Sequence, residues 1–258
     1  MKIIVLVKAV PDTYADRLLH LDTGLADRAA REEVLDEIGE RAIEVALSYA
    51  DSAPETEVVL LTMGPASAAA VIKKGLAMGA SSAVHVDDDA LAGADLGLTA
   101  EVIAAAIDHL GFDLVVAGNQ STDGMGGVLP AMVAERLGVP HVTSLGTLDI
   151  SSDGVRGERV DDDAELRLEA SLPAVVSITE RFPSGRFPSF KGIMAAKKKP
   201  YVTLSLSDLA ARVDATDAAR SIVVGIAPRP PRGAGVKVTD DGQGSVALAQ
   251  FLVDNRLV

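Results

Sequence analysis

The stretch Asp113-Leu-Val-Val-Ala117, Gly118-Asn-Gln-Ser-Thr-Asp-Gly-Met-Gly-Gly127 joins an apolar run to a loop of glycine, amide and hydroxyl residues. The helical pattern Val128 to Leu137 begins directly after this loop. In parallel-sheet proteins this order places backbone N–H groups at a helix N-terminus, where they bind phosphate. The stretch therefore predicts a parallel sheet with a nucleotide-binding loop, and an ordinary strand-to-helix turn is the alternative.

Apolar runs rich in Val and Ile alternate with helical patterns along the chain. The other expected strands are Ile3 to Val7, Val58 to Leu61, Ala83 to Val86 and Ala174 to Ile178. The expected helices between them are Asp36 to Tyr49, Ala66 to Met78 and Leu96 to Leu110. This alternation predicts a right-handed α/β fold, and the continuous hydrophobicity of the strands predicts helices on both sheet faces. The expected fold class is a Rossmann-like parallel sheet.

The region after the phosphate-type loop predicts a hairpin. Val155 to Val160 and Glu165 to Leu172 place charges between apolar residues on either side of Asp161-Asp-Asp163. Such patterning is typical of antiparallel strands with one solvated face. We therefore expect an antiparallel hairpin at the sheet edge, with the three aspartates in a solvated turn.

The composition changes again near the C-terminus. A Pro-rich stretch, Ala227-Pro-Arg-Pro-Pro-Arg-Gly-Ala-Gly235, precedes a helical pattern from Ser245 to Leu257. So short a segment has too little local core to fold alone. We expect a domain of residues 1–225 and a C-terminal arm of residues 226–258 that lies on its own domain or on another chain.

The composition excludes several classes of function. The net charge is −13 and cysteine is absent, so the protein repels nucleic acid and anionic lipid and has no disulfide or thiolate metal site. The N-terminal apolar run is too short for a signal peptide, and no stretch reaches the roughly 18 to 20 apolar residues that span a bilayer. We expect a cytoplasmic protein without direct membrane insertion.

The usual catalytic signatures are absent. The chain has no GxxxxGK[ST], no GxGxxG after the first strand, no HExxH and no GxSxG. The histidines stand far from one another in the sequence, at His20, His85, His109 and His141. We therefore predict no metal site, and we expect structural or surface roles for the histidines.

Three strand ends point to one crevice. Leu61-Thr-Met-Gly-Pro-Ala66 places glycine and proline at the end of a strand and the start of its helix. The end of the first strand, Leu6 to Ala9, and the loop Gly118 to Gly127 occupy equivalent places. Because open parallel sheets bind ligands at the carboxyl ends of their strands, these three segments predict a nucleotide site.

The segment Glu180 to Lys199 is unusual in an acidic chain with few aromatic residues. It holds Phe182, Phe187 and Phe190 together with two prolines, two glycines and six basic residues. The prolines and glycines predict a loop with an apolar tip rimmed by positive charge, which suits docking onto a protein. The alternative is a loop that folds back onto its own core.

A set of short motifs occurs in order over essentially the whole chain. They are Val5-Leu-Val-Lys8 with Val10-Pro-Asp12, Ala42-Ile-Glu-Val-Ala46, Met63-Gly-Pro-Ala66, Ala77-Met-Gly-Ala80, Gly118-x-Gln120-Ser-x-Asp123-Gly124, Leu172-Pro-Ala-Val-Val176, Phe190-x-x-Ile-Met194 with Lys197-Lys-Lys199, and Gly235-Val-Lys237. With these motifs the chain resembles the β subunit of electron transfer flavoprotein. The resemblance implies an electron carrier without catalytic residues of its own, in a heterodimer whose α subunit holds most of the FAD site.

The resemblance also implies binding sites. Structural AMP would lie against Leu6, Ala9, Asp36, Ile38, Gly39, Met63, Gly64, Gln120, Ser121, Thr122, Asp123, Gly124, Met125, Gly126, Gly127 and Val128. Residues expected near the FAD are Thr13, Tyr14 and Ile38. Phe190 would anchor acyl-CoA dehydrogenases and related flavin dehydrogenases, flanked by Arg186, Phe187, Ile193 and Met194. The electrons would pass to a membrane quinone reductase, the electron transfer flavoprotein–quinone oxidoreductase, and the C-terminal arm would pack on the α subunit.

Three alternatives remain. In an electron-bifurcating relative a second FAD replaces AMP, but the short loop Gly124-Met-Gly-Gly127 favours AMP. If the resemblance misleads, an adenine-nucleotide-binding regulator of the universal-stress type has a similar fold and would form a homodimer. An ATP-hydrolysing enzyme is disfavoured because the loop lacks a phosphate-binding lysine.

Overall fold

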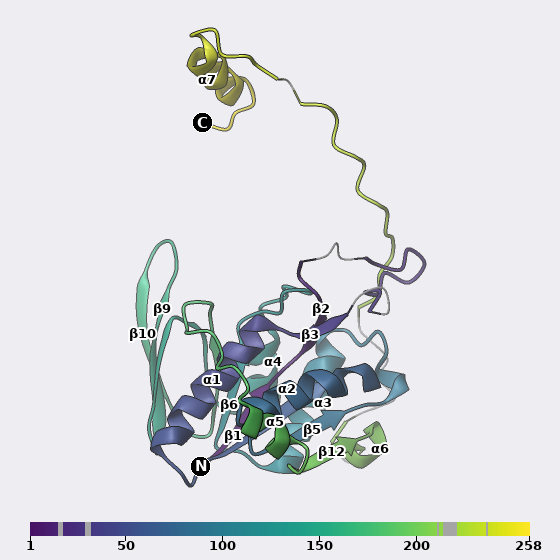
Figure 1. Ribbon diagram of the computed structural model, residues 1–258, viewed down its shortest axis with the longest axis vertical. Helices are drawn as coiled ribbons and strands as arrows, with labels where there is room; N and C mark the ends of the chain where they lie inside the picture. The colour runs from purple at the N-terminus through teal and green to yellow at the C-terminus, as the bar shows by residue number, and fades with distance from the viewer. Residues whose placement is uncertain (15–17, 29–31, 211, 214–220, 236) are drawn as a thin grey trace. The chain divides into compact units, whose positions relative to one another are not determined.

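The computed structural model describes residues 1–14, 18–28, 32–210, 212–213, 221–235 and 237–258 (Figure 1). Contacts between residues divide the chain into two units, Met1–Gly225 and Ile226–Val258. The first unit contains the sheet, its helices and the candidate site. The second contains helix α7 (Gly244–Asp254).

A seven-stranded sheet forms the centre of the first unit. Its strands are β1 (Lys2–Leu6), β4 (Glu57–Met63), β5 (Ser82–Val86), β6 (Leu114–Gly118), β7 (His141–Leu145), β11 (Ala174–Ile178) and β12 (Tyr201–Leu204). All pairs are parallel, in the order β12-β5-β4-β1-β6-β11-β7. The five predicted runs are all strands of this sheet. Strands β7 and β12 were not predicted, because polar residues interrupt their short apolar patterns.

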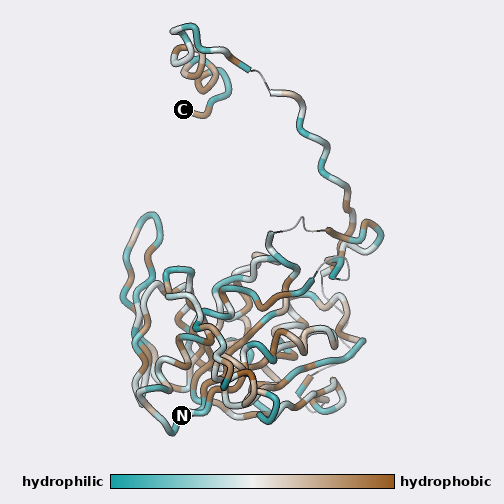
Figure 2. The backbone as a smooth tube through the Cα atoms, viewed as in Figure 1, coloured by the Kyte–Doolittle hydropathy of each residue, from teal (hydrophilic) through white to brown (hydrophobic). Residues whose placement is uncertain are grey.

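Helices cover both faces of the sheet, as predicted. They are α1 (Glu37–Ser52), α2 (Ala69–Met78) with the 3₁₀ turn η1 (Ala66–Ala68), η2 (Asp89–Leu91), α3 (Leu96–Leu110), α4 (Leu129–Leu137), α5 (Phe190–Ala196) and α6 (Leu206–Leu209). Successive strand residues face opposite ways, so Ile3 and Val5 pack with α1 and α2, while Ile4 packs with α3 and α4. The hydrophobic residues therefore follow the central strands (Figure 2).

A separate antiparallel sheet contains the predicted hairpin (Figure 1). It consists of β8 (Thr147–Ile150), β9 (Gly154–Val160) and β10 (Glu165–Ser171). The hairpin contacts the edge strand β7 but pairs with β8 rather than with the central sheet. Gly157 permits this pairing, since a Cβ there would lie 2.4 Å from the carbonyl oxygen of Thr147.

A two-stranded sheet of β2 (Ala9–Pro11) and β3 (Glu33–Leu35) follows the end of β1 and leads into α1. Its partners are antiparallel, with Ala9 opposite Leu35. Because β3 ends next to Asp36, this sheet brings the start of α1 to the carboxyl end of β1. It was not predicted, because each strand has only three residues.

The second unit contains a Pro-rich stretch and α7 (Gly244–Asp254). No residue of α7 is buried, and Val246, Leu248 and Phe251 are exposed apolar side chains. Among the described residues, no helix has both the length and the apolar character needed to cross a membrane.

Candidate functional site

A cavity of about 1250 Å³ lies at the carboxyl ends of the central strands. Leu6 from β1, Met63 from β4 and Gly118 from β6 line it, together with the segments that follow these strands. The predicted nucleotide residues in its lining are Leu6, Asp36, Ile38, Gly39, Met63, Gly64, Gln120, Ser121, Gly124, Gly126 and Gly127. The fold therefore brings the three predicted strand ends around one cavity.

The loop after β6 presents backbone donors to this cavity. Met125 and Gly127 have φ angles of 49° and 69°, so the backbone reverses direction just before α4. Within the described part of the chain, the N–H groups of Gly126 and Gly127 have no hydrogen-bond acceptor. Free N–H groups that lead into a helix N-terminus form an anion site, because the helix dipole adds to their partial positive charge.

Two cations hold this loop from one side. The Lys8 ammonium lies 2.7 Å from Oδ1 of Asp123 and 3.3 Å from Oγ of Ser121. Arg28 donates to Oε1 of Glu33 at 2.9 Å, and its second terminal nitrogen lies 3.5 Å from Oδ2 of Asp123. Burial raises the pKa of Asp123, but the hydrogen bond and charge of Lys8 outweigh it, so the net pKa lies below the ordinary value. The loop is thus fixed by charged groups.

Asp36 holds the loop from the other side. Its Oδ2 accepts a hydrogen bond from the backbone N–H of Thr122 at 2.9 Å. Burial raises the pKa of Asp36 above its ordinary value despite this bond. Within the described residues, Oδ1 of Asp36 and Oγ1 of Thr122 are buried without a hydrogen-bond partner. Buried polar atoms of this kind are rare and call for a donor or acceptor from a ligand or water.

The charge of the cavity differs from one part to another. Most charged residues in its lining are acidic, including Asp87, Asp88 and Asp89 beyond β5. Lys8 lies beside the glycine loop, with its ammonium 3.8 Å from the position of a Cβ on Gly124. An anionic group therefore fits only at the loop, whereas the acidic remainder suits neutral groups that donate hydrogen bonds.

Other predicted residues lie outside the cavity lining. Thr122, Asp123, Met125 and Val128 belong to the same loop, and Ala9 begins β2 immediately after Lys8. Thr13 and Tyr14 are exposed, with Tyr14 at 95%. The structure thus places Thr13 and Tyr14 on the surface rather than in the cavity, while Ile38 lines it.

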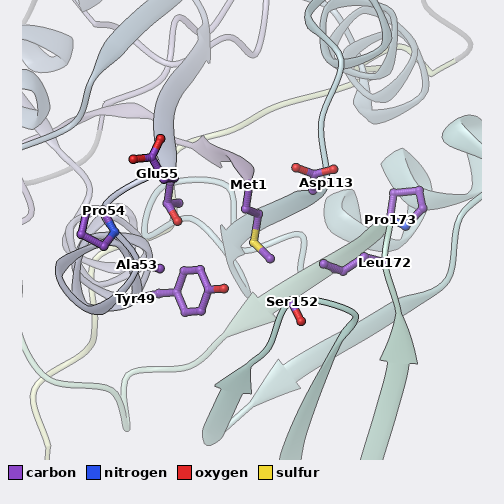
Figure 3. Close-up of a pocket in the computed structure, with 10 residues that line it drawn as sticks. Met1, Tyr49, Ala53, Pro54, Glu55, Asp113, Ser152, Leu172 and Pro173 are labelled. Atoms are coloured by element: carbon purple, nitrogen blue, oxygen red, sulfur yellow. The ribbon is translucent and has the colours of Figure 1, made fainter.

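A second cavity of about 540 Å³ lies at the opposite, amino-terminal edge of the sheet (Figure 3). Met1, Asp113 and Pro173 line it just before β1, β6 and β11. Oδ2 of Asp113 already accepts a hydrogen bond from the N–H of Lys2 at 2.7 Å. None of the predicted site residues lines this cavity, and the carboxyl-edge cavity is the candidate site.

The predicted docking segment contains a helix, which corrects the expectation of a loop. Ser189 caps α5 by accepting a hydrogen bond from the N–H of Gly192 at 3.1 Å, so Phe190 begins a helix despite the nearby prolines. Phe187 and Phe190 are 96% and 81% exposed. Phe182 instead packs against the core, which corrects its expected place in the apolar tip. The tip therefore consists of Phe187 and Phe190 with Ile193 and Met194, which are also exposed.

Comparison with known proteins identifies the family. The chain matches the model of the electron transfer flavoprotein domain over residues 23–209. It is 44% identical over 263 residues to the electron transfer flavoprotein subunit beta of Mycobacterium leprae, with 99% of each chain covered. The chain belongs to the electron transfer flavoprotein family, as a β subunit. The β subunit of Megasphaera elsdenii is 30% identical over 275 residues, covering 100% of each chain.

A further relative is the caffeyl-CoA reductase-Etf complex subunit CarD of Acetobacterium woodii. It is 31% identical over 250 residues, which cover 96% of this chain and 95% of that protein. Membership in the electron transfer flavoprotein family assigns the chain to flavin-associated electron transfer.

Two cations at the cavity of this electron transfer flavoprotein subunit were not among the predicted site residues. Lys8 lies two residues after the end of β1, and its position near a strand end was a usable signal. Arg28 lies in a segment without periodicity, so nothing local predicts that it reaches Ala9 and Glu33. Among the described residues, no group of three or more His, Asp and Glu side chains forms a candidate metal site.

Proposed function

We propose that the chain is the β subunit of a heterodimeric electron transfer flavoprotein that binds structural AMP and docks flavin dehydrogenases. FAD held mainly by the α subunit supplies the redox chemistry when bound. In this proposal the chain binds the nucleotide, presents the docking surface, and leaves electron transfer to the flavin. The acceptor we propose is a membrane quinone reductase, the electron transfer flavoprotein–quinone oxidoreductase.

The glycine loop carries the AMP proposal. The free N–H groups of Gly126 and Gly127, together with the Lys8 ammonium, suit a phosphate group. The unpartnered Oδ1 of Asp36 suits a hydroxyl or amino donor of the nucleoside. A cavity of about 1250 Å³ has room for a mononucleotide. We therefore propose the predicted loop and strand-end residues, from Leu6 to Val128, as the AMP site.

The exposed side chains of α5 and the residues before it support the docking proposal. Phe187, Phe190, Ile193 and Met194 are exposed together, and Lys191 and Lys197 add positive charge on the same helix and its end. Exposed aromatic and long apolar side chains bounded by charge are typical of interface anchors. We propose Phe190 as the anchor for acyl-CoA dehydrogenases and related flavin dehydrogenases.

Exposed side chains also support our proposal for the surfaces that face the α subunit. No residue of α7 is buried, and its apolar side chains Val246, Leu248 and Phe251 are exposed, which supports packing of residues 226–258 on the α subunit. Thr13 and Tyr14 are exposed just after β2, and we propose them, with Ile38, near the FAD.

Mass analysis of the small molecules released from the denatured heterodimer tests the nucleotide proposal. We expect one AMP and one FAD per heterodimer. Two FAD and no AMP would replace the proposal with the electron-bifurcating alternative. A stable homodimer that copurifies with no flavoprotein would favour the nucleotide-binding regulator instead.

A further inference from the structure

The start of the docking segment is bound tightly to α1 through Arg186. The backbone N–H of Arg186 donates to Oε2 of Glu44 at 2.9 Å. Its guanidinium donates to both carboxylate oxygens of Glu44, each at 2.8 Å, and to Oδ2 of Asp51 at 2.9 Å. A bidentate Arg–carboxylate pair fixes orientation as well as distance. Residue 186 is therefore held at a defined place relative to α1.

The charges of this cluster are satisfied within the chain. The side chains of Arg186 and Glu44 are only 34% and 17% exposed. Burial raises the pKa of Glu44, but the hydrogen bonds from Arg186 and Ser48 outweigh it and keep the net pKa below the ordinary value. The hydrogen bonds to Glu44 and Asp51 raise the pKa of Arg186. The guanidinium is thus committed to α1 rather than presented to a partner.

Close contacts at two glycines fix the segment on α2. A Cβ on Gly192 would lie 2.3 Å from the carbonyl oxygen of Ala77, and one on Gly185 would lie 2.8 Å from Cε of Met78. Beyond the helix, the ammonium of Lys199 donates to the carbonyl oxygen of Leu76 at 2.9 Å. The segment is therefore held at Arg186, along α5 and at Lys199.

The fixed positions bracket the exposed side chains. Phe187 follows Arg186 directly, and Phe190 begins α5 three residues later. Two apolar rings exposed on an unattached loop would lose conformational freedom on binding, and this loss weakens association. Because Arg186 already restricts the segment in the free protein, less conformational freedom is lost when the partner binds.

We infer that Arg186 is a positioning residue for docking: through Glu44 and Asp51 it holds Phe187 and Phe190 in the orientation that a dehydrogenase binds. This inference rests on the proposed docking function. It assigns Arg186 a role different from that of a contact residue, because its charge acts on α1 and not on the partner.

The test uses the heterodimer with Arg186→Met, Glu44→Gln and the double variant. Reduction of its flavin by a purified acyl-CoA dehydrogenase is followed at increasing heterodimer concentration. We expect each single variant to raise KM about tenfold with kcat unchanged, since only the association step loses preorganisation. The double variant should match the single ones, because both remove the same interaction. Deuterium uptake at residues 186–194 should rise in all three.

A matched ion pair provides the control. Arg156 and Glu169 lie 3.2 Å apart on β9 and β10, with side chains 79% and 74% exposed. Arg156→Met and Glu169→Gln remove the same charges away from the docking segment. We expect their KM to stay within about twofold of the wild type, as exposed pairs contribute little.

Two results would overturn the inference. If Arg186→Met raises KM while Glu44→Gln does not, Arg186 contacts the dehydrogenase directly. If deuterium uptake rises but KM stays unchanged, the orientation of the segment does not matter. If the Arg186→Met heterodimer does not assemble, the KM and deuterium uptake of Glu44→Gln decide whether the inference holds.

Phe190→Ala separates this inference from the proposed function. An unchanged KM in that variant would mean that the segment is not the docking site at all. A raised KM in Phe190→Ala, with wild-type KM in Glu44→Gln, would retain docking and reject positioning by Arg186.

Discussion

The glycine loop of residues 118–128 is irregular, whereas the proposed docking segment of residues 180–199 contains the helix α5, and the two are fixed in opposite ways. The loop turns its polar backbone toward a cavity and is held from outside by Lys8 and Asp36. The docking segment binds α1 through Arg186 and α2 through Lys199, and it leaves Phe187 and Phe190 in solvent. The difference indicates that the loop suits a small ligand bound inside the cavity. The segment instead suits a partner protein whose surface covers its exposed rings.

Substitutions in the two regions should therefore affect separate properties. A change in the loop is expected to alter nucleotide content without altering docking directly, and a change in the segment is expected to do the reverse. The following substitutions test that separation.

The largest effect is expected at the loop. Gly126→Glu has room, since a Cβ would lie 3.5 Å from Leu96, in ordinary contact. Its carboxylate would face the proposed phosphate, and like charges in contact cost several kcal/mol, so AMP affinity should fall more than about a hundredfold. Gly126→Gln is the uncharged control of the same size. Equal AMP retention by both variants, measured by mass analysis, would mean that the phosphate lies elsewhere.

The next effect is expected at the docking segment. Phe190→Ala removes an exposed ring, and loss of an interface anchor costs about 2 kcal/mol, or about 30-fold in kcat/KM with the donor dehydrogenase. Phe190→Leu should retain much of the activity because it keeps an apolar anchor. AMP content should not change in either variant. Loss of AMP from Phe190→Ala would show that the two regions are coupled.

A smaller effect should follow from the contact between α5 and α2. Gly192→Ala would place a methyl group 2.3 Å from the carbonyl oxygen of Ala77, so the helix must shift. Overpacking of this kind costs about 1–3 kcal/mol and should lower the melting temperature of the heterodimer. Gly233→Ala is the control, because no atom lies within 4 Å of a Cβ there. Similar melting temperatures for both variants would argue against tight seating of α5.

The smallest effect concerns pH. Ionisation of Glu44, beside the docking segment, stabilises the fold, whereas ionisation of Asp36, beside the glycine loop, destabilises it. The folded pKa of Glu44 lies below its ordinary 4.5, so its ion pair stabilises the protein above that pH and is lost as pH falls through the folded pKa. The folded pKa of Asp36 lies above its ordinary 3.8, so its ionisation destabilises the nucleotide-free protein as pH rises through the folded pKa. At pH 7, Glu44→Gln should lower the free energy of unfolding by about 1 kcal/mol, whereas Asp36→Asn should raise it, because burial disfavours the charged carboxylate.

Chemical unfolding of the nucleotide-free heterodimer at pH 7 and at about pH 3.5 would measure these differences. Both differences should shrink as the pH falls, because Asp36, whose pKa is raised, becomes neutral in the wild type, and the unfolded state gains a proton at Glu44 before the folded state does. A constant difference across the range would contradict the assigned ionisation of the two groups.

Local patterns were sufficient for much of the fold. Apolar runs and helical spacing are properties of consecutive residues, so the five predicted strands and the positions of α1, α3 and α4 could be recognised from the sequence. Strands β7, β8 and β12 were not recognised, because their pattern is short or polar and pairing with neighbours defines them.

The sequence by itself determined the parallel sheet, the glycine loop and the placing of three strand ends at one edge. Only the tertiary structure decided that Arg28 and Lys8 meet at Asp123, that Phe182 is packed away while Phe187 and Phe190 stay exposed, and that Arg186 is bound to Glu44. The physical reason is the distance along the sequence that separates the residues involved. Periodicity is encoded over a few residues, whereas Arg186 and Glu44 are 142 positions apart and become neighbours only when the sheet and helices have packed.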